Sequence, residues 1–179
     1  MKFIHIGDMH LGVQPDKDRE WSKIRQDEVW DAVTRVVERC NEEEVDLLLL
    51  AGDIFHSQPL VRQLKDLNYR LSQLTKTKVV MIAGNHDYIK ENSHYGNYEW
   101  NSNITMLTNK EVDSIYFEDI NTEVYGFSYH TREITEARID SIKPKNKDRI
   151  NILLANGGDE KHMPINYKSL QYSGFHYIA

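Results

Sequence analysis

In the first half of the chain, short runs of apolar residues alternate with longer segments in which apolar residues have helical spacing. Residues 2–6, 45–51 and 78–83 are mostly apolar, as in strands that are buried in a sheet. Between them, residues 21–40 and 60–74 place apolar side chains three or four positions apart, which predicts two amphipathic helices. This order predicts an α/β fold with a parallel sheet, in which the carboxyl ends of the three strands lie at one edge.

The second half of the chain predicts a second sheet. Residues 114–117 and 123–129 favour two strands of a hairpin, and residues 150–155 and 175–179 favour two further strands. Residues 135–142 indicate a short helix that Pro144 ends. The preceding residues 88–103 are typical of a long loop, whose aromatic side chains we expect to pack over the sheet edge.

Composition supports one globular domain across residues 1–179, because 40% hydrophobic residues suffice for a single sizeable core. The longest apolar run, residues 47–51, is far shorter than the roughly 20 residues that a membrane-spanning helix needs. His5 and Asp8 interrupt the stretch that a secretory signal would keep apolar, and the lone Cys40 cannot form an intramolecular disulfide. We therefore expect a cytoplasmic protein that is not in the membrane.

The net charge bears on the choice of substrate. The chain carries 28 acidic and 22 basic residues, a formal charge of −6. Such a surface repels a phosphate backbone on average, so a nucleic-acid substrate would need local basic groups or bound cations. Four basic residues lie within residues 143–149, but this run is more typical of a solvated loop than of a DNA contact.

Polar side chains follow each of the three predicted parallel strands. Taken alone, each group is compatible with an ordinary polar turn. Together they bring carboxylate, imidazole and amide groups to one sheet edge, and these are ligands for Mn²⁺, Fe²⁺ or Zn²⁺. The sequence therefore predicts a divalent metal site formed by Asp8 and His10, by Asp53, and by Asn85 and His86.

These groups lie in three motifs that resemble a known family. GDMHLG at residues 7–12, AGDIFH at 51–56 and GNHD at 84–87 look like the first three motifs of the calcineurin-like metallophosphoesterases. Within that superfamily, Leu-Gly after the first His and Phe-His after the second Asp resemble the SbcD-type DNA-repair exonucleases. The resemblance implies an α/β sandwich of two mixed β-sheets flanked by helices, and metal-dependent hydrolysis of phosphodiester bonds.

The resemblance also implies a role for each residue of the site. Two divalent ions would bind, with Mn²⁺ the first choice and Fe²⁺, Zn²⁺ or Mg²⁺ as alternatives. Asp53 would bridge the two ions, Asp8 and His10 would hold the first, and the carbonyl oxygen of Asn85 the second. His86 would protonate or stabilise the leaving oxygen, His56 would position the phosphate or DNA end, and Asp87 would orient His86.

Two departures from the family pattern affect the second metal. Asn156 stands where the family has a histidine ligand, and a neutral amide binds a transition metal more weakly than imidazole does. The family's Gly-His-x-His motif would follow residue 179, so we expect residues 1–179 to be an N-terminal portion that ends before this motif and the C-terminal cap region. The other histidines, His5, His94, His130, His162 and His176, are expected to be structural or on the surface.

Three functional hypotheses follow. The first is a DNA exo- or endonuclease subunit in repair or recombination, which would act on DNA ends with an SbcC-like ATPase subunit. The second is a metallophosphoesterase for a small phosphoester, which the acidic charge favours. The third is a non-catalytic module that binds DNA or a partner, which Asn156 favours. Open sheet edges and exposed apolar surface would also favour a homodimer.

Overall fold

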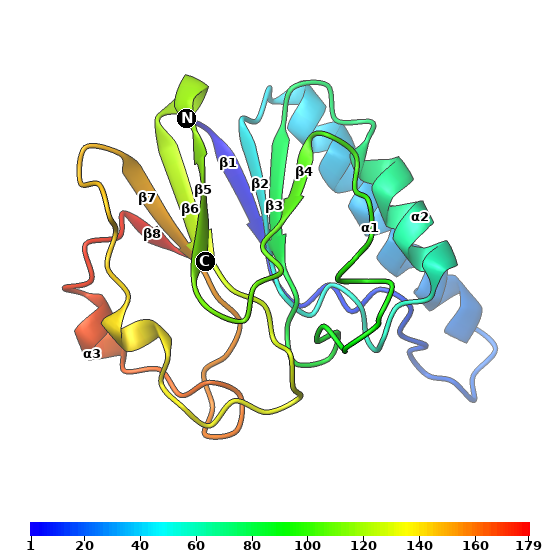
Figure 1. The fold of residues 1–179 in the computed structure, drawn as a ribbon. Helices are drawn as coiled ribbons and strands as arrows, with labels where there is room; N and C mark the ends of the chain where they lie inside the picture. Colours follow the sequence, from blue (N-terminus) through cyan, green and yellow to red (C-terminus); the bar gives the residue numbers. More distant parts are fainter.

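Two four-stranded sheets pack face to face in the computed structural model, which describes residues 1–179 (Figure 1). The first sheet is parallel throughout, with neighbouring strands β1 (Phe3–Ile6), β2 (Leu47–Ala51), β3 (Lys78–Ile82) and β4 (Ile104–Met106). The second sheet is mixed, because β5 is antiparallel to β6 and the other pairs are parallel. Its strands are β5 (Asp113–Phe117), β6 (Thr122–Gly126), β7 (Ile150–Leu154) and β8 (Tyr177–Ile178). The predicted α/β fold with two sheets flanked by helices is thus confirmed, although only the second sheet is mixed and not both.

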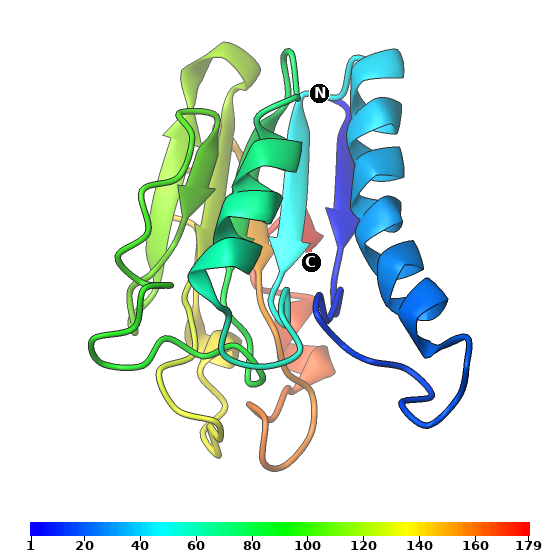
Figure 2. The same cartoon turned by 90° about the vertical axis from the view of Figure 1, so that its right-hand side faces the viewer.

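Two helices cover the outer face of the first sheet (Figure 2). Helix α1 (Ser22–Glu42) buries Val33, Val37 and Cys40, and helix α2 (Val61–Leu71) buries Leu64, Leu67 and Leu71. The spacing of these residues follows the helical period, which places them on one face of each helix. Each fully buried side chain of this size contributes about 1.5–3 kcal/mol to stability. None of the helices combines the length and the apolar character needed to cross a bilayer.

Strand β2 is buried along its whole length because both of its faces are covered, one by the helices and the other by the second sheet. Leu48 and Leu50 face the helices, whereas Leu47 and Leu49 face the second sheet. Residues of β3, β6 and β7 complete the layer between the sheets, among them Val80, Ile82, Val124, Ile152 and Leu154. This double burial explains why β2 is a continuous apolar run instead of an alternating one.

The outer face of the second sheet has a smaller cover. It consists of the short helix α3 (Tyr167–Leu170) and the 3₁₀ turn η2 (Ile139–Ser141), which pack on Tyr125 and Leu153. Another 3₁₀ turn, η1 (Glu118–Ile120), connects β5 to β6 within the predicted hairpin.

The structure differs from the sequence prediction in two segments. The helix predicted at residues 135–142 is wrong, since only the single turn η2 forms there. Ile134, which precedes this segment, forms an isolated bridge with His162, and residues 135–138 between that bridge and η2 form no helical turn. Strand β4 was not predicted, because three residues give no readable alternation.

Candidate metal centre

The loops that follow β1 and β2 run side by side and continue the parallel pairing of their strands. The backbone N–H of His10 donates to the carbonyl oxygen of Asp53 at 2.9 Å, and that of Leu11 donates to Ile54 at 2.8 Å. The N–H of His56 in turn donates to the carbonyl oxygen of Leu11 at 3.1 Å. These bonds bring the first two predicted motifs into direct contact at the carboxyl ends of the strands.

Three residues of these loops have left-handed backbone conformations. Asp8, His10 and Asp53 have φ angles of 53°, 48° and 47°. Such a conformation costs a residue other than glycine about 1–3 kcal/mol, and clusters of such residues are typical of functional sites. Gly52, next to Asp53, has φ of 79°, and a Cβ there would lie 2.7 Å from the Cβ of Asn156.

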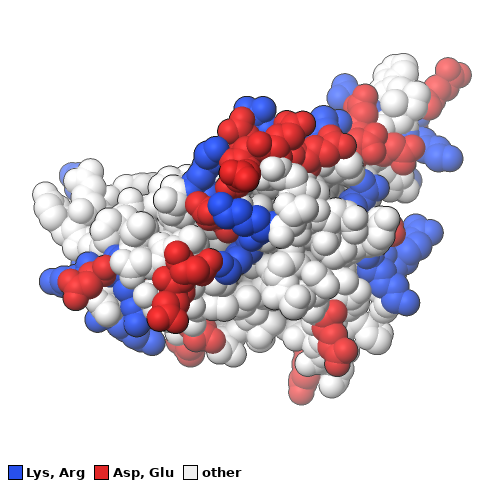
Figure 3. Space-filling model, turned by 90° about the horizontal axis from the view of Figure 1, so that it is seen from above, with Lys and Arg blue, Asp and Glu red and all other residues white.

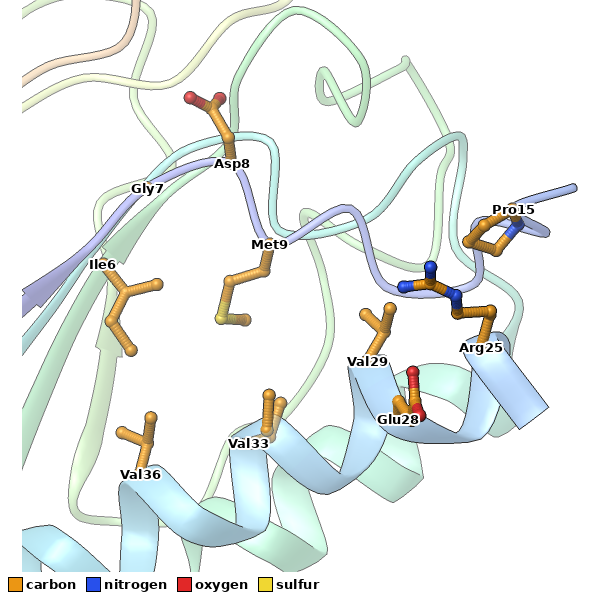
Figure 4. Close-up of a pocket in the computed structure, with 11 residues that line it drawn as sticks. Ile6, Gly7, Asp8, Met9, Pro15, Arg25, Glu28, Val29, Val33 and Val36 are labelled. Carbon is orange, nitrogen blue, oxygen red and sulfur yellow. The ribbon is translucent and has the colours of Figure 1, made fainter. Parts of the chain in front are cut away.

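The turn after β1 sends successive side chains to opposite sides (Figure 4). Met9 points into an apolar cavity of about 430 Å³ between this turn and α1, which Val29 and Val33 also line. Asp8 points away from that cavity. The apolar contact of Met9 therefore fixes the turn, while the polar residues on either side of it remain available to the site.

Asp8, His10 and Asp53 converge. Their ligand atoms all lie within 4.8 Å of one another, a spacing that a single ion can hold after small side-chain adjustments. Burial lowers the pKa of His10 and outweighs the nearby Asp53 carboxylate, which raises it. The imidazole is therefore neutral at pH 7, as a metal ligand must be.

The residues present fit a divalent cation. Nδ1 of His10 is buried and has no hydrogen-bond partner in the protein, so this site leaves a buried polar atom that the fold does not satisfy. Two carboxylates and one neutral imidazole are also a typical donor set for Mn²⁺, Fe²⁺ or Zn²⁺.

The two carboxylate oxygens of Asp53 face different neighbours. Oδ2 lies 4.0 Å from Nε2 of His10. Oδ1 accepts a hydrogen bond of 2.8 Å from the backbone N–H of His86, in the loop after β3. A carboxylate placed in this way can serve two cations, one on each side.

Gly84 allows the loop after β3 to approach Asp53 closely. A Cβ at this position would lie 2.3 Å from Oδ1 of Asp53 and 2.9 Å from Oδ1 of Asn156. The side-chain oxygens of Asp53 and Asn156 thus both lie close to the space that a Cβ of residue 84 would occupy. Asn85 is the next residue of the loop and is half-buried. Its side chain makes no hydrogen bond to the protein, whereas the backbone N–H groups of its neighbours Gly84 and His86 donate to Asp87 and Asp53.

Asn156, which follows β7, comes from the second sheet. Its Nδ2 donates to the carbonyl oxygen of Ala51 at 3.2 Å, which turns its Oδ1 toward Gly84 and Asp53. The hydroxyl of Tyr129 donates to the backbone carbonyl of Asn156 at 3.0 Å. The predicted position of Asn156 beside the other site residues therefore agrees with the structure, and Tyr129 is a neighbour that the sequence did not reveal.

His56 and His86 stand beside His10. The ring centroids of His10 and His86 lie 4.7 Å apart, and His56 lies 5.5 Å from each. Nδ1 of His86 is 3.1 Å from the carbonyl oxygen of His56. Because a carbonyl oxygen only accepts, Nδ1 of His86 carries the proton in that bond, and Nε2 is free to face a ligand.

Asp87 does not orient His86, contrary to the sequence prediction. Its carboxylate is fully buried and accepts from the backbone N–H groups of Gly84 and Phe55 and from the hydroxyl of Tyr95, at 2.7, 3.1 and 3.1 Å. Burial raises its pKa to about 6. Asp87 instead ties the loop after β3 to the loop after β2, and the carbonyl of His56 takes the orienting role.

The other histidines lie in other environments, and four of them have partners within the fold. These pairs are His5 with the Tyr177 hydroxyl, His130 with the Thr108 carbonyl, His162 with Asp159, and His176 with the Asn151 N–H. His94 is exposed. Their predicted structural or surface character agrees with these contacts.

Comparison with known proteins agrees with the metal-binding geometry of the site. The protein-family profile "Calcineurin-like phosphoesterase" matches residues 1–177. The chain is also similar to "Uncharacterized metallophosphoesterase YhaO" of Bacillus subtilis (strain 168), with 25% identity over 198 aligned residues. That alignment covers all of this chain and 47% of the relative, so the chain spans about half the length of the curated relative it matches. The chain belongs to the calcineurin-like phosphoesterase family, whose members hydrolyse phosphoesters with divalent metals.

Proposed function

We propose that this chain is the catalytic core of a DNA exo- or endonuclease of the SbcD type, with DNA ends and an SbcC-like ATPase subunit as its partners. The observation that carries the proposal is the convergence of Asp8, His10 and Asp53, with the imidazoles of His56 and His86 alongside. The SbcD-like residues Leu11 and Phe55 support it, because they pair across the two loops and thereby place His56 next to the site.

Divalent ions bound at this site would generate a nucleophile near neutral pH and neutralise the charge that develops on the phosphate. Asp8, His10 and Asp53 would hold the first ion. The other oxygen of Asp53, with Asn85 and Asn156, would hold the second. The second set contains two neutral amides, so it attracts a cation less strongly than the first set does.

His86 supplies proton chemistry in this proposal. Its Nδ1 proton is engaged by the His56 carbonyl, so Nε2 is the atom that exchanges a proton with the leaving oxygen. His56 is exposed, and its ring centroid lies 5.5 Å from that of His86, so its imidazole would bind a phosphate oxygen in the same site.

A small phosphoester is the second candidate substrate, and the charge of the chain favours it. The formal charge is −6. Figure 3 shows the edge opposite to the site, where acidic and basic side chains are intermixed, so this edge offers no continuous basic surface to a DNA backbone. A small ester avoids the long-range repulsion that a DNA backbone experiences.

Hydrolysis of linear duplex DNA and of a bis-aryl phosphodiester, measured side by side with Mn²⁺, tests the proposal. We expect DNA cleavage that chelator abolishes and that Asp53→Asn reduces at least about 100-fold, since this carboxylate serves both cation positions. Asp66→Asn, an exposed aspartate on α2, is the matched control and should cleave normally. Hydrolysis of the aryl ester alone would support the small-ester candidate. Hydrolysis of neither substrate by a metal-loaded protein would support a non-catalytic module.

A further inference from the structure

The site contains a second group of possible metal ligands, made only of nitrogen donors. The ligand atoms of His10, His56 and His86 all lie within 4.8 Å of one another. We propose that these three imidazoles form a binding site for a nitrogen-preferring divalent ion such as Zn²⁺, and that an ion bound there excludes the phosphate of the substrate. The exclusion, unlike the site itself, rests on the proposed function.

The spacing of the three rings matches that of imidazoles around one tetrahedral ion. With Zn–N bonds of about 2.0–2.1 Å and tetrahedral angles, neighbouring imidazole centres lie about 5.2 Å apart. The centroid distances among His10, His56 and His86 are 4.7, 5.5 and 5.5 Å. The spacing of the rings therefore suits a common ion, and the exposed side chain of His56 can rotate to complete the site.

The neighbours of two rings prepare them for binding. The carbonyl of His56 holds Nδ1 of His86, and such a bond fixes the tautomer and orientation of a ligating histidine. Nδ1 of His10 is buried and has no protein partner. Ligands that are already oriented lose little conformational freedom on binding an ion.

The two possible ligand groups select different ions. Asp8, His10 and Asp53 offer mostly carboxylate oxygen, which suits Mn²⁺ and Mg²⁺, whereas three imidazoles suit Zn²⁺ and Cu²⁺. The groups share His10, so one ion at the three histidines competes with an ion at the carboxylates. An ion at the three histidines also takes both imidazoles assigned to the phosphate, His56 and His86. We therefore expect Zn²⁺ to inhibit the protein by competing with Mn²⁺ for His10 and with the substrate for His56 and His86.

Metal binding, measured without any substrate, tests the site. Zn²⁺ and Mn²⁺ are titrated separately into the protein against a competing chelator, for wild type, His56→Gln, His86→Gln and His94→Gln. We expect each of the first two variants to lose at least tenfold in Zn²⁺ affinity and to keep the Mn²⁺ affinity. Co²⁺ in place of Zn²⁺ should show a tetrahedral absorption spectrum that weakens in the same two variants. His94→Gln removes an exposed imidazole elsewhere and should behave as wild type.

The outcomes separate this inference from the proposed function. Wild-type Zn²⁺ affinity in both His56→Gln and His86→Gln would overturn the three-histidine site, and so would equal losses of Zn²⁺ and Mn²⁺ affinity. Selective loss of Zn²⁺ affinity would support the site even if the Mn²⁺-loaded protein hydrolysed no phosphoester, in which case the proposed function alone would fail.

Discussion

Tyr129 joins the second sheet to the site through three hydrogen bonds. Its backbone N–H donates to the carbonyl of Ala83 at 3.1 Å, and its own carbonyl accepts from the N–H of Ile89 at 2.8 Å, so it holds the loop after β3 on both sides of residues 84–87. Its hydroxyl donates to the carbonyl of Asn156 at 3.0 Å. Because the side chain is 1% exposed, no water replaces that bond if the hydroxyl is removed.

The substitution Tyr129→Phe removes only the bond to Asn156 and keeps both backbone bonds. A neutral hydrogen bond of this kind contributes about 0.5–1.5 kcal/mol to stability, and an unsatisfied carbonyl raises the loss to at most about 3 kcal/mol. We expect the free energy of unfolding to fall by about 1–2 kcal/mol. Asn156 would also become less well placed beside Asp53, so the weaker of two Mn²⁺ equivalents should lose up to about tenfold in affinity, equivalent to about 1.4 kcal/mol.

Urea unfolding and calorimetric titration of Mn²⁺ measure these two effects. Tyr125→Phe is the matched control, because Tyr125 is equally buried in β6 and its hydroxyl accepts from the N–H of Lys145 at 2.9 Å. That variant should lose similar stability and no Mn²⁺ affinity. Equal Mn²⁺ affinity in the two variants would show that the hydroxyl of Tyr129 does not position Asn156.

Three further substitutions have defined outcomes. Gly84→Ala places a Cβ 2.3 Å from the Asp53 carboxylate, so it should cost about 1–3 kcal/mol in urea unfolding and weaken Mn²⁺ binding, whereas unchanged values would mean that the loop adapts freely. Tyr95→Phe removes a donor to the buried carboxylate that ties two site loops together, and the melting temperature should drop by an amount equivalent to about 1–3 kcal/mol. Burial pushes the pKa of Glu123 upward, but hydrogen bonds, including one from Arg149, hold it below its usual value of 4.5. A lowered carboxyl pKa stabilises the fold above pH 4.5 and loses this effect as the pH falls. Arg149→Met should therefore cost about 1.5–3 kcal/mol at pH 7 and progressively less below pH 4.5, and a pH-independent cost would refute this assignment.

The sequence predicts the first three strands and the two helices of the first sheet well because their signals are local. Strand β2 is a single apolar run, α1 and α2 have helical spacing, and parallel topology alone brings Asp8 and Asp53 to one edge. These features require no knowledge of side-chain partners.

The supporting hydrogen bonds of the site were not predictable in the same way, because they join residues far apart in sequence. The bond of Phe55 to Asp87 spans 32 positions, and that of Tyr129 to Asn156 spans 27. A GNHD motif shows that an aspartate follows His86, but only the packing of the loop shows that its carboxylate turns into the core. The orienting role predicted for Asp87 is therefore contradicted by its buried contacts.

The site thus combines ligands from one sheet with supports from the other. The carboxylates and imidazoles come from the strongly packed first sheet, whereas Asn156 and Tyr129 come from the second sheet, whose outer face has less helical cover. The left-handed conformations of Asp8 and Asp53 cost about 1–3 kcal/mol each and persist because their own loops pair with each other. Asn156 lies in no such paired loop and is held by one hydrogen bond to Ala51 of the first sheet and one from Tyr129. Loosening the contacts between the two sheets should therefore weaken the second cation site before the first. The two cation sites thus differ in the contacts that hold their residues as well as in their ligands.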